Sequence, residues 1–153
     1  MSASMLEEVR EVARRWPTAL AFVAGDEAID YGALVRRIDE AAAGLQAGVH
    51  VVRGGAIEAV IAAFAVRAAG GVPLVVGPQD GVDATFEGGL GAAWLRTTSG
   101  TSGAPRVLTV DEAQALATAR VHVELTGLGP GVGCVVTVPP WTSYGWNLSL
   151  IHI

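Results

Sequence analysis

The chain has 153 residues, of which 51% are apolar, and a net charge of −5 at pH 7. This length and apolar content predict one globular domain with its own core rather than a disordered tail. The acidic balance and the lack of a basic run exclude nucleic acid as a partner. A single cysteine, Cys134, excludes an internal disulfide, and its apolar neighbours predict a buried side chain.

The sequence also argues against secretion and membrane insertion. Glu7, Glu8 and Glu11 lie near the N-terminus, where a secretory signal would carry positive charge. The longest apolar stretch, residues 59–66, is far shorter than the ~20 residues that span a bilayer. The three histidines have no metal-ligand spacing. We therefore predict a cytoplasmic protein with no membrane span and no metal ligands of its own.

Hydrophobic periodicity predicts alternating helices and strands along the chain. In the first half we expect helices at residues 5–15, 31–47 and 54–69, and strands at 19–23, 28–30, 49–52 and 72–76. Asp30 is expected to cap the second helix and Gly48 to end it. In the second half we expect strands at 92–96, 107–109 and 134–138 and a helix at 111–125, with 77–91 mostly loop. This order predicts an α/β fold in which helices cover both faces of a mostly parallel sheet.

Residues 97–106, between two expected strands, combine hydroxyls, two glycines and an arginine. Glycine permits sharp turns and close approach to a ligand, successive N–H groups form an anion nest, and an arginine fork suits phosphate oxygens. The spacing is not that of a Walker loop, and the alternative is a plain polar turn. The candidate phosphate-binding residues are Thr98, Ser99, Gly100, Thr101, Ser102, Gly103 and Arg106.

This order of residues resembles the signature loop of the adenylate-forming superfamily, which contains acyl-CoA synthetases, adenylation domains of nonribosomal peptide synthetases and luciferases. The family form is Thr-Ser-Gly-Thr-Thr-Gly-x-Pro-Lys, and here Ser102 and Arg106 keep the hydroxyl and the positive charge. Residues 19–34 and 58–74 resemble the family's opening hairpin and its buried helix. Residues 139–145 resemble its Pro-x-x-His-x-x-Gly segment beside the acyl pocket, with Thr142 in place of the histidine.

The resemblance implies a ligase that uses Mg²⁺-ATP to convert a carboxylate into an acyl-adenylate and pyrophosphate. The acyl group would then pass to the thiol of CoA or of a carrier protein's phosphopantetheine arm. The loop would hold the β- and γ-phosphates, with Arg106 either joining it or anchoring it. Trp141, Tyr144 and Trp146 are candidates for the carboxylate pocket, and the alternative for them is plain core.

The resemblance also implies that residues 1–147 are a partial N-terminal AMP-binding domain. In the family a small C-terminal lid carries the adenylation lysine, and this sequence contains no lysine. We therefore assign no catalytic residue to the chain and expect it to be inactive alone. Residues 148–153 match the translation of a transposase adapter used in sequencing libraries, which predicts a non-native tail. The alternative is a natural strand, because apolar and polar residues alternate there.

Three alternatives remain at this stage. The chain could be a non-catalytic nucleotide-binding module, or an α/β structural domain whose loop is fortuitous. Within the superfamily it could be an adenylation domain of a nonribosomal peptide synthetase. We favour an acyl-CoA synthetase because the chain starts at a methionine followed by a short leader helix.

Overall fold

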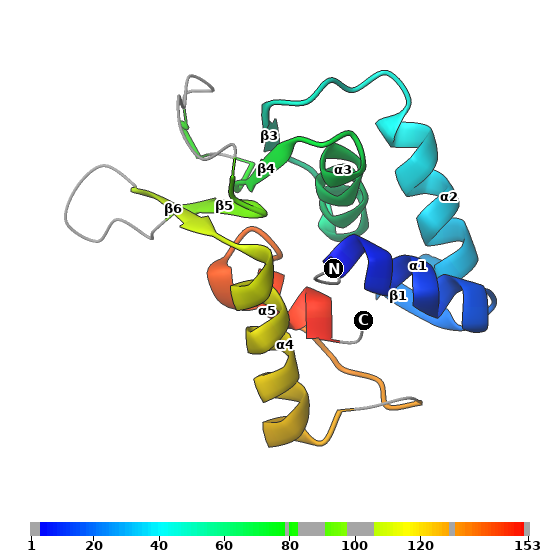
Figure 1. The fold of residues 1–153 in the computed structure, drawn as a ribbon. Coiled ribbons are helices and arrows are strands. Elements are labelled where there is room, and N and C mark those ends of the chain that lie inside the picture. Colours follow the sequence, from blue (N-terminus) through cyan, green and yellow to red (C-terminus); the bar gives the residue numbers. More distant parts are fainter. Residues whose placement is uncertain (1–3, 79, 83–90, 98–105, 129–130, 152–153) are drawn as a thin grey trace.

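The computed structural model describes residues 4–78, 80–82, 91–97, 106–128 and 131–151 (Figure 1). Helices and strands alternate through the first half of the chain, as the periodicity predicted. The elements in chain order are α1 (Met5–Arg15), β1 (Leu20–Ala24), β2 (Glu27–Asp30), α2 (Tyr31–Ala42), β3 (Val49–Val52), α3 (Ala56–Ala68), β4 (Val72–Val75), β5 (Trp94–Thr97), β6 (Val107–Val110), α4 (Glu112–Thr126) and α5 (Ser143–Ile151).

The strands form two sheets. β1 and β2 make an antiparallel hairpin, and the larger sheet has the order β3-β4-β5-β6. β3, β4 and β5 run parallel, whereas β6 pairs antiparallel with β5. The predicted α/β class with a mostly parallel sheet is therefore confirmed.

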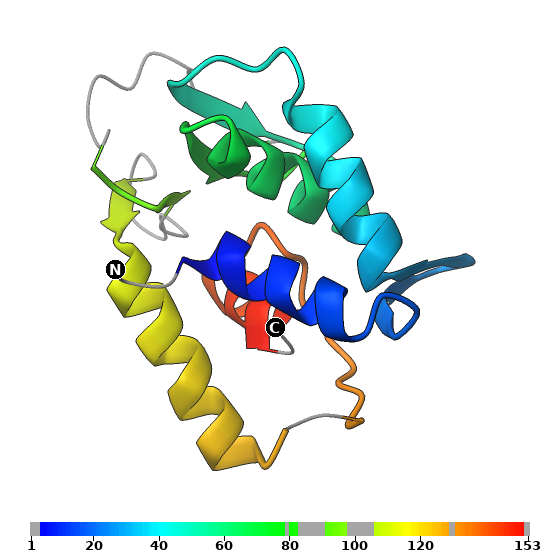
Figure 2. The ribbon, with the colours of Figure 1, turned by 45° about the vertical axis from the view of Figure 1, so that its right-hand side comes forward.

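The main core lies between the sheet and the helices. All five helices contribute buried side chains to it or pack partly buried ones against it, together with Val52, Val75 and Trp94 from the strands. In Figure 2, α1 (blue) lies between the α2–α3 layer and α4, and it contacts all three helices. A second, smaller cluster contains Leu74 and Leu95, whose neighbours in it come from strands and loops. Among the described residues, helical side chains therefore enter only the first of the two clusters.

An ion pair fastens three helices together. Glu112, the first residue of α4, accepts hydrogen bonds from the backbone N–H of Met5 and from Arg67 Nη2, the latter at 3.3 Å. Arg67 also donates to the carbonyl oxygen of Gly71 at 3.0 Å. Both charged side chains are mostly buried, with exposed fractions of 24% for Arg67 and 20% for Glu112. The carboxylate therefore links the start of α1 and the end of α3 to α4.

Side-chain caps explain where α2 and α4 begin. Asp30 Oδ1 accepts from the N–H of Ala33 at 2.6 Å, which confirms the predicted cap of α2. Asp111 caps α4 through a reciprocal pair of bonds with Gln114. Each cap satisfies N–H groups that lack a partner within the helix, so the start positions follow from local sequence.

The end of α2 was predicted wrongly. The helix stops at Ala42 rather than Ala47, because Ala43 is extended and Gly44 adopts a φ of +106°. Leu45, expected on the apolar stripe of that helix, still packs against the main core from the segment after it. Gly44, not Gly48, provides the backbone conformation that ends the helix.

The strand predicted at residues 134–138 is absent from the structure. Val135 is 88% exposed, and Cys134 is exposed rather than buried as predicted. An apolar run forms a strand only where another strand pairs with it, and within the described residues no strand pairs with this run. The chain then enters α5, which includes residues 148–151 of the predicted tail in helical rather than extended form.

Candidate functional site

The ends of three parallel strands define one edge of the sheet. Because β3, β4 and β5 are parallel, their carboxyl ends, at Val52, Val75 and Thr97, meet at this edge. Thr97 pairs with Val107, so β5 ends and β6 begins at this same edge. In α/β sheets, ligands bind beyond the carboxyl ends of the strands.

Most of the predicted phosphate-binding residues lie outside the described part of the chain. This applies to residues 98–103, so their hydrogen bonds to phosphate stay predictions. Arg106 is described, and it is exposed immediately before β6. Arg106 therefore directly precedes Val107, the residue that pairs with Thr97 at the carboxyl end of β5.

The turn after β4 packs closely on an indole ring. The N–H of Gly77 donates to Asp80 Oδ2 at 2.7 Å, and Arg53 Nη2 donates to the carbonyl oxygen of Asp80 at 2.7 Å. A Cβ atom at Gly77 would lie 3.1 Å from Trp141 Nε1, which is closer than side chains normally approach. Glycine at position 77 thus allows Trp141 to sit against the edge of the sheet.

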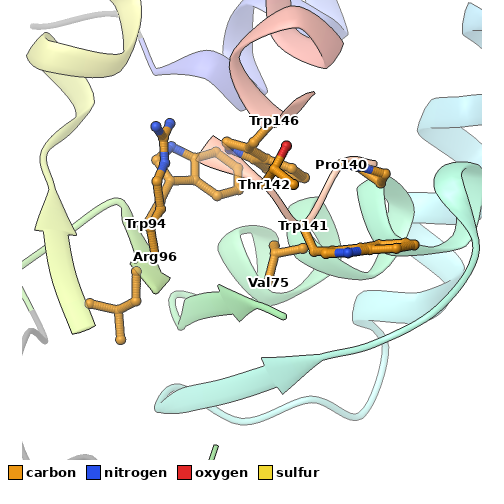
Figure 3. Close-up of a pocket in the computed structure, with 8 residues that line it drawn as sticks. Val75, Trp94, Arg96, Pro140, Trp141, Thr142 and Trp146 are labelled. Carbon is orange, nitrogen blue, oxygen red and sulfur yellow. The ribbon is translucent and has the colours of Figure 1, made fainter. Parts of the chain in front are cut away.

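Two of the three predicted pocket aromatics come together. Trp146 is 2% exposed, and its ring centroid lies 5.0 Å from that of Trp94. Tyr144 is 58% exposed and lies beside His122 of α4, with ring centroids 6.3 Å apart. A small cavity under the start of α5 (Figure 3) is lined by Val75, Trp94, Leu95, Arg96, Pro140, Trp141, Thr142 and Trp146. Trp141 and Trp146 thus share one cavity lining, from which Tyr144 is absent.

Thr142 has a structural role that sequence reasoning missed. Its Oγ1 accepts from the N–H of Gly145 at 3.0 Å and donates to the carbonyl oxygen of Pro139 at 2.8 Å, which caps α5. A Cβ at position 145 would lie 2.0 Å from that same carbonyl oxygen, so only glycine fits there. A threonine followed by a glycine three residues later is the sequence signal for this turn.

The cavity also contains a charged group that sequence reasoning did not single out. Arg96 lies in β5, and its Nη2 donates to Asn147 Oδ1 of α5 at 2.7 Å. Burial lowers the pKa of Arg96 below its usual value. In Figure 3, Trp94 and Arg96 extend from β5 toward Trp146 of α5. An arginine following the apolar residues 92–95 is the signal that points to this site.

Two further features bear on ligands and location. Within the described ranges, no group of three histidine, cysteine, aspartate or glutamate side chains is arranged to hold a metal ion. No helix in that part of the chain is both long and apolar enough to cross a membrane.

Comparison with known proteins identifies the fold. No family model matches the sequence, and no curated protein matches it. O-succinylbenzoate coenzyme A synthetase from Bacillus subtilis, in complex with ATP and magnesium, matches with a TM-score of 0.76 at 13% identity, over 98% of this chain and 54% of that chain. MbtA from Mycobacterium smegmatis matches with a TM-score of 0.77 at 17% identity, over 99% of this chain and 43% of that chain. A long-chain-fatty-acid-CoA ligase from Archaeoglobus fulgidus matches with a TM-score of 0.73 at 14% identity, over 99% of this chain and 45% of that chain.

The chain therefore has the fold of the N-terminal part of adenylate-forming enzymes, as the resemblance of its loop predicted. It spans about half the length of these solved structures, between 43% and 54% in the three cases. Because the sequence identities are this low, the likeness establishes the fold of this chain and nothing beyond it.

Proposed function

We propose that this chain is the N-terminal part of an AMP-forming acid–thiol ligase, with residues 1–147 belonging to its AMP-binding domain. The observation that carries the proposal is the pairing of β5 with β6, because β5 ends and β6 begins at the carboxyl edge of the parallel strands. The composition of the loop between these two strands suits a polyphosphate, and the edge is where α/β sheets bind ligands. The match to a synthetase in complex with ATP and magnesium supports it.

The loop residues would bind the phosphates that leave as pyrophosphate. Thr98, Ser99, Thr101 and Ser102 offer hydroxyl donors, and Gly103 allows the backbone to approach the ligand. Such groups act by positioning the phosphates and stabilising their charge rather than by covalent chemistry.

The donor set fits ATP, and its metal ion would be bound largely by the nucleotide. Arg106 is exposed immediately before β6, at the end of the loop, and a guanidinium offers planar N–H donors that suit phosphate oxygens. Mg²⁺ usually keeps several waters and binds substrate phosphates with few protein ligands. When bound, Mg²⁺ would offset the charge of the phosphates.

The carboxylate substrate would enter near Trp141 and Trp146, which line the cavity next to the same edge. Tyr144 does not line this cavity, because its side chain is exposed and lies beside His122 of α4. We propose CoA as the thiol acceptor, since two of the matched structures are a CoA synthetase and a CoA ligase. A carrier protein's phosphopantetheine arm is the alternative acceptor.

Equilibrium binding of Mg²⁺-ATP to the 153-residue chain tests the loop. Hydrogen bonds to charged oxygens contribute roughly 1.5–3 kcal/mol each, and about 1.4 kcal/mol corresponds to a tenfold change in affinity. The double variant Thr101→Ala/Ser102→Ala is therefore expected to weaken ATP binding at least about tenfold.

A matched control removes two hydroxyls far from the loop. Thr118 and Thr126 of α4 donate to helix carbonyl oxygens at 2.8 and 2.6 Å, so Thr118→Ala/Thr126→Ala should leave ATP affinity unchanged. Equal affinity for the loop variant and the wild-type chain would contradict the proposal and favour a structural domain with a fortuitous loop.

A further inference from the structure

The cavity under α5 collects N–H donors that lack acceptors. Trp94 Nε1, Arg96 Nε and Trp146 Nε1 are buried, and none has a hydrogen-bond partner within the described part of the chain. All three residues line the same cavity. A buried donor without an acceptor is costly, and most buried polar groups in proteins are paired. The site therefore lacks a hydrogen-bond acceptor.

The missing acceptor should carry negative charge. Arg96 is positively charged at neutral pH, and its Nη2 donates to the neutral amide oxygen of Asn147 at 2.7 Å. Among the described residues no carboxylate forms an ion pair with it. A partly buried cation that is paired with an amide alone favours binding of an anion.

The size of the cavity restricts the ligand. Its volume of about 10 Å³ admits roughly one oxygen atom. Of the residues that line it, Trp94 and Trp146 are 1% and 2% exposed, whereas Thr142 is exposed. One oxygen of an anion would thus occupy the cavity, and the rest of the ligand would extend past Trp141 and Thr142.

We propose that this cavity is a carboxylate-binding site, in which Arg96 and the indole N–H groups of Trp94 and Trp146 hold one oxygen of a small organic acid. The identity of that acid as the ligase substrate rests on the proposed function. In that case the bound group is a second acidic group of the substrate, because a carboxylate held by an arginine is a poor nucleophile. The binding itself requires neither ATP nor the loop.

Thermal unfolding of the chain with increasing sodium acetate, against sodium chloride at equal ionic strength, tests the site. A ligand that binds only the folded state stabilises it by RT ln(1 + [L]/Kd). At ten times Kd, acetate is expected to raise the Tm by roughly 3–6 °C for a chain of this size. Acetamide, which has a similar shape but no charge, should produce a much smaller rise.

Two substitutions locate the effect. Arg96→Met removes the partly buried charge, so it should abolish the acetate-dependent rise while leaving the Tm without acetate equal or higher. Asn147→Asp places a carboxylate 2.7 Å from Arg96 in a side chain of the same shape, so it should raise the Tm and compete with acetate. Arg36→Met, on the exposed face of α2, loses the same charge and should keep the full acetate response.

Several results would overturn the proposal. If acetate and chloride act alike, the cavity holds water only. If acetamide matches acetate, the site accepts any oxygen and is not specific for carboxylates. An acetate response that survives in both Arg96→Met and Asn147→Asp would place the ligand elsewhere. Because no nucleotide is present, these outcomes are separate from the ATP-binding test of the proposed function.

Discussion

Tyr31 allows a quantitative prediction about stability at alkaline pH. It is the first residue of α2 and is 6% exposed. Burial raises the pKa of its hydroxyl from 10.0 to about 12, because the folded protein disfavours the charged phenolate. The folded state therefore retains a proton that the unfolded state releases between pH 10 and pH 12.

The sign and size of the effect follow from proton linkage. The contribution of Tyr31 to stability is fully present below pH 10 and is lost as the pH rises toward 12. Each pH unit in this window costs at most about 1.4 kcal/mol, so the full loss is about 2–3 kcal/mol. The sequence contains no lysine, whose titration would otherwise overlap with that of tyrosine.

Urea denaturation at pH 9, 10 and 11 measures this loss. The wild-type free energy of unfolding should fall by about 1 kcal/mol between pH 10 and 11. Tyr31→Phe should reduce that fall, whereas Tyr144→Phe, at a side chain that is 58% exposed, should retain it. If Tyr31→Phe keeps the wild-type dependence on pH, the argument from burial is refuted.

Two further predictions concern the core and the ion pair. Glu112→Gln weakens the bond to Arg67 and should lower the free energy of unfolding by about 1–3 kcal/mol, while the exposed Glu40→Gln should change it by less than about 1 kcal/mol. If Glu112→Gln and Glu40→Gln lower the free energy of unfolding equally in urea denaturation, burial does not strengthen the interaction of Glu112 with Arg67. Phe64→Ala, at a fully buried ring, should cost about 3–5 kcal/mol by the same assay, against little for Val23→Ala at 60% exposure. A small loss for Phe64→Ala would mean that the core collapses around the missing ring.

Helix starts and most strands could be predicted from local sequence. Asp30 caps α2 because its carboxylate reaches an N–H group three residues ahead, and that geometry needs no other part of the fold. The buried helix α3 and strand β4 follow from nearly continuous apolar runs between glycines. At Gly71 the reason is visible only in three dimensions, because a Cβ there would lie 2.7 Å from the carbonyl oxygen of Gly48.

The candidate site was predicted only in part. The order of residues 98–106 predicts a phosphate-binding loop, which stays a prediction, and the pairing of Thr97 with Val107 shows where the strands on either side of it meet. The contact of Arg96 with Asn147 joins residues 51 positions apart, which no local pattern reveals. The apolar run at 134–138 misled the prediction because a strand also requires a partner.

The amino-acid sequence by itself determined the α/β order of elements, the helix caps and the hydroxyl- and glycine-rich loop. These features depend on hydrogen bonds and side-chain periodicity within a few residues. The tertiary structure alone decided the early end of α2, the irregular path of residues 131–138 and the gathering of Trp94, Arg96 and Trp146 around one cavity. The physical reason is that these features depend on which distant surfaces pack together, and burial of apolar area between such surfaces outweighs local preference.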